Sequence, residues 1–473
     1  MNAARRIAPA ILLTGVLVVS GCFATPVYKL PPSSQAPDCL TPTSGSDRDV
    51  LVGLSVSGGG SRAALFAAGG MEALGRMRIG PKQLSLLEQV SYISSVSGGS
   101  LASAYYVVKK PNKLTPVLTP NGEMTDMYRD FFKGFKETVA QDYEGPLLWH
   151  NLFRLRWANP AWTARSLAEI LNEKYLGGIT FSELAHREIK GNSPYLMINS
   201  TLYNDGRRFI LSTLPRQTSR YDPMPDLNKN MPVQEKDEEA DQALRARWED
   251  LQSRTPEDLN MDICPIKVAA AVAASMSFPP VIGPISFRVG EQNLYWHAGD
   301  GGLSDNSGAE SLLMLFLKKL QEGKARKALI IALDSSFPFS VGGEALNNRA
   351  EGFTLFSYDV SRIPSIMEER SLAYRTLFFR VAQRQGLIPD KKALLVVVLR
   401  HTDAKWNEDL SDLPESCQKE KVNWKSPKDV SSHLAGVVTR LFIKSTCDQD
   451  LVLAAAAKVV AQNENKIRKF LEP

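Results

Sequence analysis

A glycine-rich turn between an apolar run and a helical pattern occurs twice in this chain, and it limits the folds that the chain can adopt. The first copy follows the apolar run Val50 to Val56, reads Ser57-Gly58-Gly59-Gly60-Ser61-Arg62, and leads into a helical stretch from Ala63 to Met77. The first N–H groups of a helix have no carbonyl partner within it, so they attract an anion. We therefore expect Gly58, Gly59 and Gly60 to supply N–H donors for a negatively charged oxygen.

The second copy of the layout places a serine on the turn. Residues Val90 to Val96 predict a strand, Ser100 to Val108 predict a helix, and Ser97-Gly98-Gly99 lies between them. The two glycines let the chain reverse sharply and expose the Ser97 hydroxyl, which is typical of a nucleophile elbow. Ser95 stands where the usual elbow has glycine, two residues before the nucleophile.

A third motif, the aspartate loop Asp300-Gly301-Gly302, follows much later in the chain. Together the three motifs resemble the patatin-like phospholipases and the related cytosolic phospholipase A2 catalytic domains, which use a Ser-Asp dyad. The resemblance implies that Ser97 is the nucleophile and that Asp300 is the base. Asn306 falls where patatins have an asparagine after this loop. Arg62 is the basic residue after the oxyanion loop, and we assign it to substrate phosphate binding, with a structural ion pair as the alternative.

The chemistry of a two-residue site follows from acid strength. An unperturbed aspartate has a pKa of about 4, so it is a weak base toward a serine hydroxyl. Burial of Asp300 would raise that pKa, and we expect an acyl-Ser97 ester that is then hydrolysed by water activated by Asp300. The resemblance implies fatty acyl esters of phospholipids or lysophospholipids as substrates, and it implies no metal and no organic cofactor. The alternative is a lipoprotein that binds lipid or a protein partner on the same scaffold without turnover.

The sequence also allows a catalytic triad as an alternative to the Ser-Asp dyad. The run Lys327 to Leu333 predicts a strand that ends at Asp334, and Ala393 to Arg400 predicts another that ends at His401. Ser97, Asp334 and His401 then follow the chain order of an α/β-hydrolase. Polar residues are common just after strands, and neither residue lies in a motif like that of Asp300, so the dyad is favoured.

The amino terminus predicts export and lipidation. Residues 1–21 combine Arg5 and Arg6 with an apolar stretch too short to span a bilayer, as in a signal peptide. The sequence Val19-Ser20-Gly21-Cys22 resembles a bacterial lipobox, so we expect Cys22 to be lipidated. Phe23 follows the cysteine in place of an aspartate, which favours the outer membrane of a bacterial cell envelope. Residues 22–45 are rich in proline, serine and threonine and predict an extended tether.

The net charge and the number of cysteines limit which binding partners and which redox states are expected. The formal net charge of +5 falls by two when Arg5 and Arg6 leave with the signal, which gives no indication of nucleic acid binding. Protein partners are not indicated. Apart from Cys22, the chain has four cysteines, namely Cys39, Cys264, Cys417 and Cys447. They allow two disulfides in any of three pairings, or free buried thiols.

The remaining pattern predicts one catalytic domain over residues 46–473, of α/β class with a three-layer patatin-like fold and a mostly parallel sheet. Further strands are expected over Tyr195 to Ser200 and Arg208 to Thr213, and a helix over Ala309 to Leu320. Residues 111–262 are expected to form a large helical insertion. Within it, apolar and aromatic residues from Leu147 to Trp162 alternate with arginines. That segment is either a lid or interfacial helix or a core helix with snorkelling arginines.

Overall fold

The computed structural model describes eleven stretches of the chain and a few short pieces between them. The stretches are 25–32, 39–40, 48–80, 83–153, 159–219, 252–290, 294–336, 379–384, 388–419, 424–437 and 440–472, and the short pieces are 242, 246, 373, 376–377 and 386. The predicted signal peptide and Cys22 therefore lie outside the described residues. Over the described part of the chain, no helix combines the length and apolar character that crossing a membrane requires.

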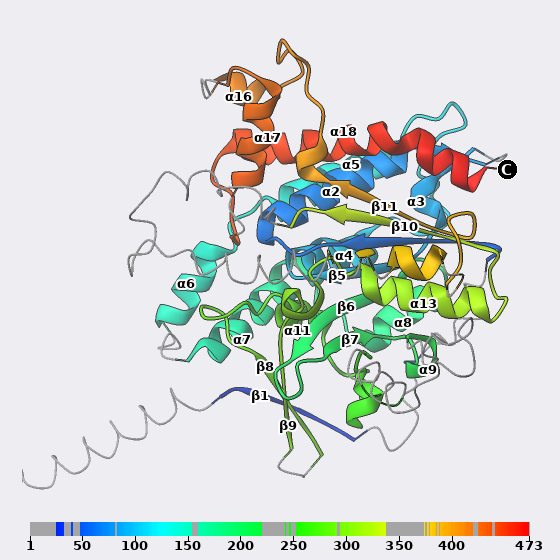
Figure 1. Ribbon diagram of the computed structural model, residues 1–473. Helices are drawn as coiled ribbons and strands as arrows, with labels where there is room; N and C mark the ends of the chain where they lie inside the picture. The colour runs from blue at the N-terminus through cyan, green and yellow to red at the C-terminus, as the bar shows by residue number, and fades with distance from the viewer. Residues whose placement is uncertain are drawn as a thin grey trace, which may run out of the picture.

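A twisted mixed sheet forms the centre of the described structure (Figure 1), and its strand order is β1-β8-β9-β6-β5-β2-β10-β11, with β7 paired to β6. The pairs from β6 through β5, β2 and β10 to β11 are parallel, whereas β7 and β9 run antiparallel to β6. Its strands are β1 (Val27–Leu30), β2 (Val50–Val56), β5 (Val90–Val96), β6 (Tyr195–Leu202), β7 (Arg208–Ser212), β8 (Ile285–Val289), β9 (Tyr295–Asp300), β10 (Lys327–Asp334) and β11 (Leu394–Arg400), and a separate hairpin joins β3 (Arg78–Ile79) to β4 (Leu84–Ser85).

Helices cover both faces of the sheet (Figure 1). The α-helices are α2 (Gly60–Arg76), α3 (Leu86–Gln89), α4 (Gly98–Lys109), α5 (Asp126–Val139), α6 (Glu144–Phe153), α7 (Pro160–Leu171), α8 (Phe181–Ile189), α9 (Arg216–Ser219), α11 (Val268–Ser275), α12 (Gly302–Asp305), α13 (Ala309–Gln321), α16 (Glu415–Lys419), α17 (Pro427–Gly436) and α18 (Thr446–Leu471). Short helical turns also occur at Asn172–Leu176, Pro256–Leu259 and His401–Asp403.

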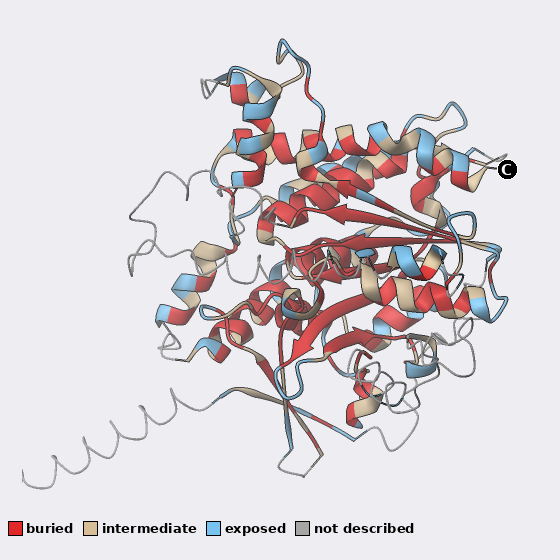
Figure 2. Ribbon diagram, in the orientation of Figure 1, coloured by how far each residue is buried: buried red, intermediate tan, exposed pale blue. Residues whose placement is uncertain are grey.

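The layers follow from the alternation of side chains along the strands. Val52 and Leu54 of β2 face a core shared with α2, α4 and α18, whereas Leu51 of the same strand faces a second core shared with α13. A parallel strand covered on both faces is buried along both sets of side chains, and β2 and β5 are buried almost along their whole lengths, including the serines of β5 (Figure 2). The predicted three-layer α/β class with a mostly parallel sheet is confirmed.

The segment 111–262, expected as a helical insertion, also contributes to the main sheet. It supplies helices α5 to α8, and then β6 and β7, of which β6 pairs in parallel with β5. The strand expected over Tyr195 to Ser200 therefore lies in the middle of the sheet. Most of the highly charged part, Tyr221 to Asp262, lies outside the described residues.

The expectation that the whole tether is an unpacked spacer is wrong for its described part. Val27–Leu30 forms edge strand β1, which pairs in parallel with β8. The ring of Tyr28 packs against Phe287 with centroids 5.9 Å apart, and the guanidinium of Arg165 lies 4.0 Å from the Tyr28 ring centroid. The prolines flank this short apolar run rather than interrupt it, so the run can pair with the sheet.

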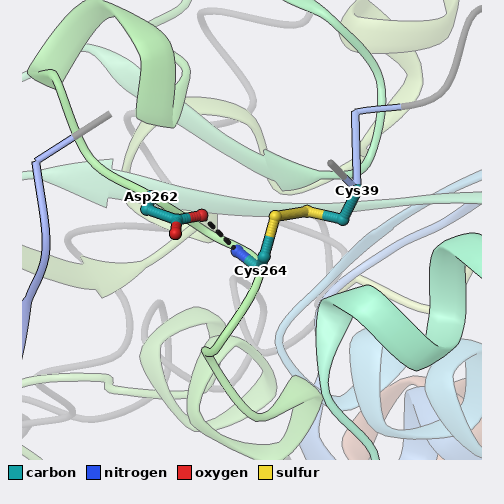
Figure 3. A group of neighbouring side chains, drawn as sticks. All are labelled: Cys39, Asp262 and Cys264. Atoms are coloured by element: carbon teal, nitrogen blue, oxygen red, sulfur yellow. Dashed lines mark hydrogen bonds between the residues drawn. A yellow bond between two sulfur atoms is a disulfide. The ribbon is translucent and has the colours of Figure 1, made fainter. Parts of the chain in front are cut away.

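The four cysteines form the disulfides Cys39–Cys264 and Cys417–Cys447. Figure 3 shows the first of them beside Asp262, whose carboxylate accepts a hydrogen bond of 2.9 Å from the N–H of Cys264. Both sulfur atoms are used in the bridge, so this group lacks the thiolates that a metal site would need. The bridge fixes the amino-terminal segment to the domain across a sequence separation of 225 residues.

Candidate active site

Ser97 and Asp300 meet at the ends of two strands that lie on either side of β6. Ser97 occupies the turn between β5 and α4, and Asp300 is the last residue of β9. The Ser97 hydroxyl donates a hydrogen bond of 2.9 Å from Oγ to Oδ2 of Asp300. The structure therefore brings together the two residues that the sequence pairs as nucleophile and base, with a geometry suited to proton transfer.

The turn at Ser97 has the strained backbone of an elbow. Ser97 has φ 50° and ψ −125°, a combination that residues other than glycine rarely adopt. The next residue has to be glycine, because a Cβ on Gly98 would lie 2.0 Å from the carbonyl oxygen of Gly60. Ser95, which replaces the usual glycine, is accommodated because its Oγ donates a 3.3 Å hydrogen bond to the carbonyl of Met197 on β6.

A serine at the end of α11 holds the elbow from behind. The N–H of Ser97 donates to Oγ of Ser275 at 2.8 Å, and that hydroxyl donates to the carbonyl of Asn199 at 2.6 Å. Ser100 on α4 lies 3.0 Å from the same hydroxyl, measured between the Oγ atoms. Sequence reasoning missed Ser275 and Asn199. The available signal was a polar residue at the end of the apolar run Val268–Ser275 and a group of polar residues at the end of the strand Tyr195–Leu202.

Asp300 is held in an environment that disfavours its charge. Its side chain is buried, and burial is the main reason that its pKa rises to about 7. Hydrogen bonds from the N–H of Gly302 at 2.8 Å and from the Ser97 hydroxyl oppose this rise. A carboxylate with a pKa of about 7 is a far better base for a serine hydroxyl than an ordinary aspartate.

The glycine loop lies beside the nucleophile, but its three N–H groups are not equivalent. A Cβ on Gly58 would come within 3.3 Å of the Ser97 Cβ, so the loop and the elbow are in contact. The N–H of Gly58 donates to the carbonyl of Asn306 at 2.9 Å, and the expectation that it serves as an oxyanion donor is wrong for this arrangement. Gly59 and Gly60 occupy the N-cap and the first position of α2, where no earlier carbonyl of the helix faces their N–H groups.

Gly59 has a backbone that only glycine adopts without strain. Its φ is 139°, and a Cβ there would lie 2.7 Å from the carbonyl oxygen of Ser335. This close approach places the loop directly over the residue that follows β10. The conformation of the loop is therefore fixed by the contact with Ser335 as well as by its own turn.

Arg62 points away from the site, and its predicted role in binding a substrate phosphate is wrong. Its side chain is fully buried, and its guanidinium donates to the carbonyl of Ser335 at 2.9 and 3.1 Å and to the carbonyl of Val437 at 2.5 Å. The first turn of α2 directs this residue inward under the glycine loop. Arg62 thus has a structural role. These hydrogen bonds are to backbone carbonyl groups.

The rival triad does not assemble. The Asp334 carboxylate accepts a 3.0 Å hydrogen bond from Nε of Arg400, whereas the hydrogen bond of His401 is to the backbone carbonyl of Asp334, at 3.4 Å. His401 is fully buried, and burial together with the nearby charge of Arg62 lowers its pKa to about 3. It follows β11, three strands away from β5, which corresponds to roughly 14 Å at the usual strand spacing.

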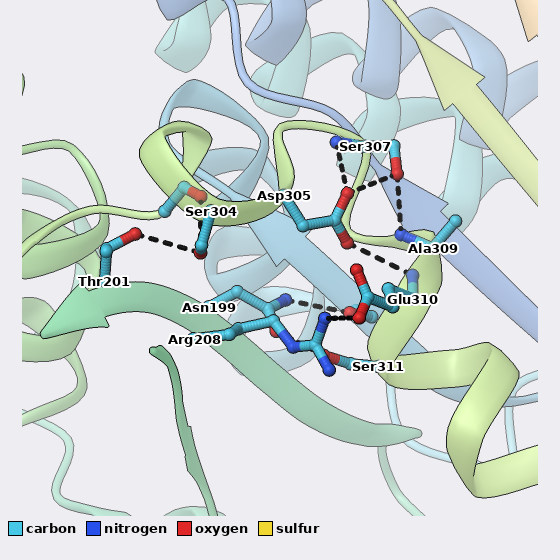
Figure 4. Close-up of polar contacts among 11 residues, drawn as sticks. Asn199, Thr201, Arg208, Ser304, Asp305, Ser307, Ala309, Glu310 and Ser311 are labelled. Atoms are coloured by element: carbon cyan, nitrogen blue, oxygen red, sulfur yellow. Dashed lines mark hydrogen bonds and ion pairs between the residues drawn. The ribbon is translucent and has the colours of Figure 1, made fainter. Parts of the chain in front are cut away.

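A polar cluster anchors the segment that follows Asp300 (Figure 4). Buried Asp305 accepts hydrogen bonds from the N–H and hydroxyl of Ser307 and from the N–H of Glu310, and so caps the start of α13. Glu310 forms a 2.8 Å ion pair with Arg208 on β7. The Thr201 hydroxyl, on β6, donates to the carbonyl of Asp300 at 2.9 Å. These contacts fix the aspartate loop to the sheet at several points.

Comparison with solved structures gave matches of low sequence identity. Human GIVD cytosolic phospholipase A2 is 13% identical with a TM-score of 0.43, over 89% of this chain and 60% of that chain. The same human protein in complex with methyl gamma-linolenyl fluorophosphonate and terbium chloride is 14% identical with a TM-score of 0.42, over 89% and 59% of the two chains. This chain thus spans about three fifths of the length of those chains.

A search of curated proteins gave no match. A family model described as patatin-like phospholipase matches residues 54–313, which is more than half of the chain. The matched stretch contains the glycine loop, Ser97 and Asp300. The chain therefore belongs to the patatin-like phospholipase family.

Proposed function

We propose that this protein is a lipid acyl hydrolase that cleaves fatty acyl esters of phospholipids or lysophospholipids through an acyl-Ser97 intermediate. Membership of the patatin-like phospholipase family supports lipid hydrolysis as the activity. The observation that carries the proposal further is the 2.9 Å hydrogen bond from the Ser97 hydroxyl to the buried carboxylate of Asp300. A serine paired directly with a carboxylate whose pKa is raised is suited to acyl transfer.

The proposed reaction has two halves. In the first, Oγ of Ser97 attacks the ester carbonyl, its proton passes to Oδ2 of Asp300, and the N–H groups of Gly59 and Gly60 stabilise the oxyanion. The alcohol, which is a lysophospholipid or a glycerol-phosphate headgroup, leaves with the proton from Asp300. In the second half, water attacks the acyl ester and gives a proton to Asp300. The fatty acid then leaves, and Ser97 regains its proton.

The purified protein is expected to release free fatty acids from vesicles of mixed diacyl phospholipids and lysophospholipids. Mass spectrometry of the released acids and of the remaining lipids measures the rate, the acyl position and the headgroup preference together. The binding-only alternative predicts that vesicles bind to the protein while their ester content stays constant. Unchanged ester content with every lipid offered would contradict the proposal.

An exposed apolar face on α6 suggests how the enzyme meets its substrate. Leu148, Trp149 and Leu152 are 64%, 60% and 56% exposed, whereas Leu147 on the same helix is buried. Asn151 connects α6 to α7 by a 3.2 Å hydrogen bond from Nδ2 to Oγ1 of Thr163, and α7 packs on α11, which ends at Ser275. This arrangement favours the interfacial alternative for the part of the segment that is described. Trp157, which belongs to the same segment from Leu147 to Trp162, lies outside the described residues.

Replacing Leu148 and Trp149 by serine is expected to reduce hydrolysis of vesicle lipids about tenfold or more, because two exposed apolar side chains no longer enter the lipid surface. Hydrolysis of a short, water-soluble acyl ester should be unchanged, because neither residue contacts the dyad. The matched control is Leu114→Ser, since Leu114 is 84% exposed and lies outside α6. Equal loss toward vesicles and soluble esters would contradict an interfacial role.

We further propose that the protein is exported and anchored in the bacterial envelope, in the outer membrane, through lipidated Cys22. The support is the lipobox-like sequence Val19 to Cys22 and the absence of aspartate after it. Replacing Cys22 by alanine is expected to move the protein from the membrane fraction to the soluble fraction. Fractionation of cells with labelled palmitate measures this directly, and an unchanged membrane distribution without label in the wild type would contradict the proposal.

A further inference from the structure

A cavity lies at the end of the sheet opposite to the dyad. Its volume is about 360 Å³, at the small end of the range for ligand pockets. Val90 and Tyr195, the first residues of β5 and β6, contribute to its wall. Ser97 follows the other end of β5, so about 20 Å of strand separates the cavity from the nucleophile. The cavity is therefore distinct from the candidate active site.

A partly buried ammonium group without a carboxylate partner among the described residues lines this cavity. Nζ of Lys110 donates to the carbonyl groups of Asn192 at 2.8 Å and Pro111 at 3.2 Å, and no carboxylate of the described residues lies within ion-pair distance. Burial lowers its pKa to about 8, and the nearby charge of Arg187 adds to that effect. At neutral pH the group is still mostly charged. A partly buried charge whose hydrogen bonds go only to neutral carbonyl groups carries a desolvation cost, and an anionic ligand would reduce that cost.

Neither acidic residue in the wall forms an ion pair with Lys110, although the charge of Glu88 partly opposes the fall in the pKa of Lys110. Burial raises the pKa of Glu188 to about 8, so this carboxyl is mostly neutral at pH 7, and it bonds to the hydroxyl of Thr213 and the N–H of Leu196. Glu88 uses its two carboxylate oxygens to accept from the N–H groups of Ser85 and Val117. Arg48 and Lys113 add two further cationic side chains to the lining. The cavity thus presents net positive charge.

Part of the remaining wall is apolar, and the wall also includes a hydroxyl without a hydrogen-bond partner. Val117, Leu87 and the rings of Tyr106 and Tyr128 supply apolar surface, and burial raises the pKa of both tyrosines, so they are neutral. Ser193 also lines the cavity, is 7% exposed, and its Oγ has no hydrogen-bond partner within the described structure. This hydroxyl is therefore available to bind a polar group that enters the cavity.

We propose that this cavity is a second binding site, for the carboxylate head and the first methylenes of a medium-chain fatty acid. The carboxylate would lie between the Lys110 ammonium and the Ser193 hydroxyl, and the chain would lie against Val117, Tyr106 and Tyr128. Both parts of the ligand are needed, because the cavity offers one cationic end and an apolar wall. That such an acid is also the product of the enzyme depends on the proposed function, whereas the binding site does not.

Binding of octanoate to the purified full chain, measured by isothermal titration calorimetry, tests this site. Octanoate contains no ester, so the measurement is independent of hydrolysis and remains valid even if the proposed function fails. We expect saturable binding that weakens about tenfold or more in Lys110→Gln, because a hydrogen bond to a charged group is lost. Octanol, which has the same chain without the charge, should bind at least tenfold more weakly than octanoate.

Two further variants separate this site from general effects. Lys109→Gln is the matched control, because Lys109 is an exposed neighbour outside the cavity lining, and it should bind octanoate like the wild type. Ile189→Trp narrows the cavity from its rim, where Ile189 is 62% exposed, and should weaken binding in a protein with unchanged thermal stability. Absence of octanoate binding in the wild type would overturn the proposal. Equal binding in the wild type and in both Lys110→Gln and Ile189→Trp would assign octanoate to another site and overturn it as well.

Discussion

Replacing Asp300 by asparagine is expected to lower ester hydrolysis by about 10²- to 10⁴-fold and, at the same time, to make the protein more stable at alkaline pH. The loss of activity follows because an amide cannot take the Ser97 proton. The fold should be retained, since asparagine has the same shape and its oxygen can still accept the 2.8 Å hydrogen bond from the N–H of Gly302.

The gain in stability follows from the direction of the Asp300 pKa. Burial raises this pKa from its ordinary value of 3.8 to about 7, so the folded protein binds a proton that the unfolded chain releases. The contribution of this group to the free energy of unfolding is therefore fully present below about pH 4 and is lost as pH rises through 7. At pH 8 the loss amounts to at most about 4 kcal/mol, and the asparagine variant avoids it.

Urea unfolding of the wild type and of Asp300→Asn, at pH 4 and at pH 8, measures this effect beside the hydrolysis rate. Asp305→Asn is a matched control, because Asp305 is also buried but caps α13 and does not contact Ser97. Asp300→Asn should be the more stable variant at pH 8 and close to the wild type at pH 4. Retained hydrolysis in Asp300→Asn would remove Asp300 from the mechanism, whatever its effect on stability.

Replacing Ser97 by alanine should have the largest effect on activity, a loss of about a millionfold, because the acyl intermediate no longer forms. The binding of lipid should be retained, since the glycine loop and the apolar face on α6 are unchanged. The measurement is hydrolysis of a chromogenic acyl ester together with vesicle binding by sedimentation.

Ser95→Ala is the control for Ser97→Ala. Ser95 lies two residues away, is buried, and donates to the carbonyl of Met197 rather than to a substrate. Its replacement should leave hydrolysis within about tenfold of the wild type. If Ser97→Ala and Ser95→Ala lost activity equally, the effect would be due to the elbow as a whole and Ser97 would not be the nucleophile.

The sequence was most informative where a local pattern and the fold coincide. The strands Val50–Val56 and Val90–Val96 have the predicted bounds, because each is rich in β-branched and other apolar residues and ends at a glycine-rich turn. The contact between Ser97 and Asp300 was expected from the resemblance to a family, because each residue lies in a motif of that family. The spacing of the two residues in the sequence carried no information on this contact.

The sequence was least informative where the direction of a side chain depends on distant parts of the chain. Arg62 follows the glycine loop, but its carbonyl partners are Ser335 and Val437, far away in the sequence. The N–H of Gly58 is similarly occupied by the carbonyl of Asn306. Ser275 holds the elbow through a hydrogen bond across 178 residues of sequence. Such contacts are set by how helices and strands pack, and no local pattern predicts them.

We propose that the buried carboxylate of Asp300 activates Ser97 for attack on the substrate. The most direct measurement is the rate at which a fluorophosphonate labels Ser97, followed by mass spectrometry of the modified peptide between pH 5 and pH 9. We expect Ser97 to be labelled at a rate that rises with pH through an inflection at about 7, which is the pKa of Asp300. In Asp300→Asn we expect the labelling to be much slower and the inflection to be absent. Labelling of Ser97 at the same rate and with the same pH profile in Asp300→Asn would contradict this proposal.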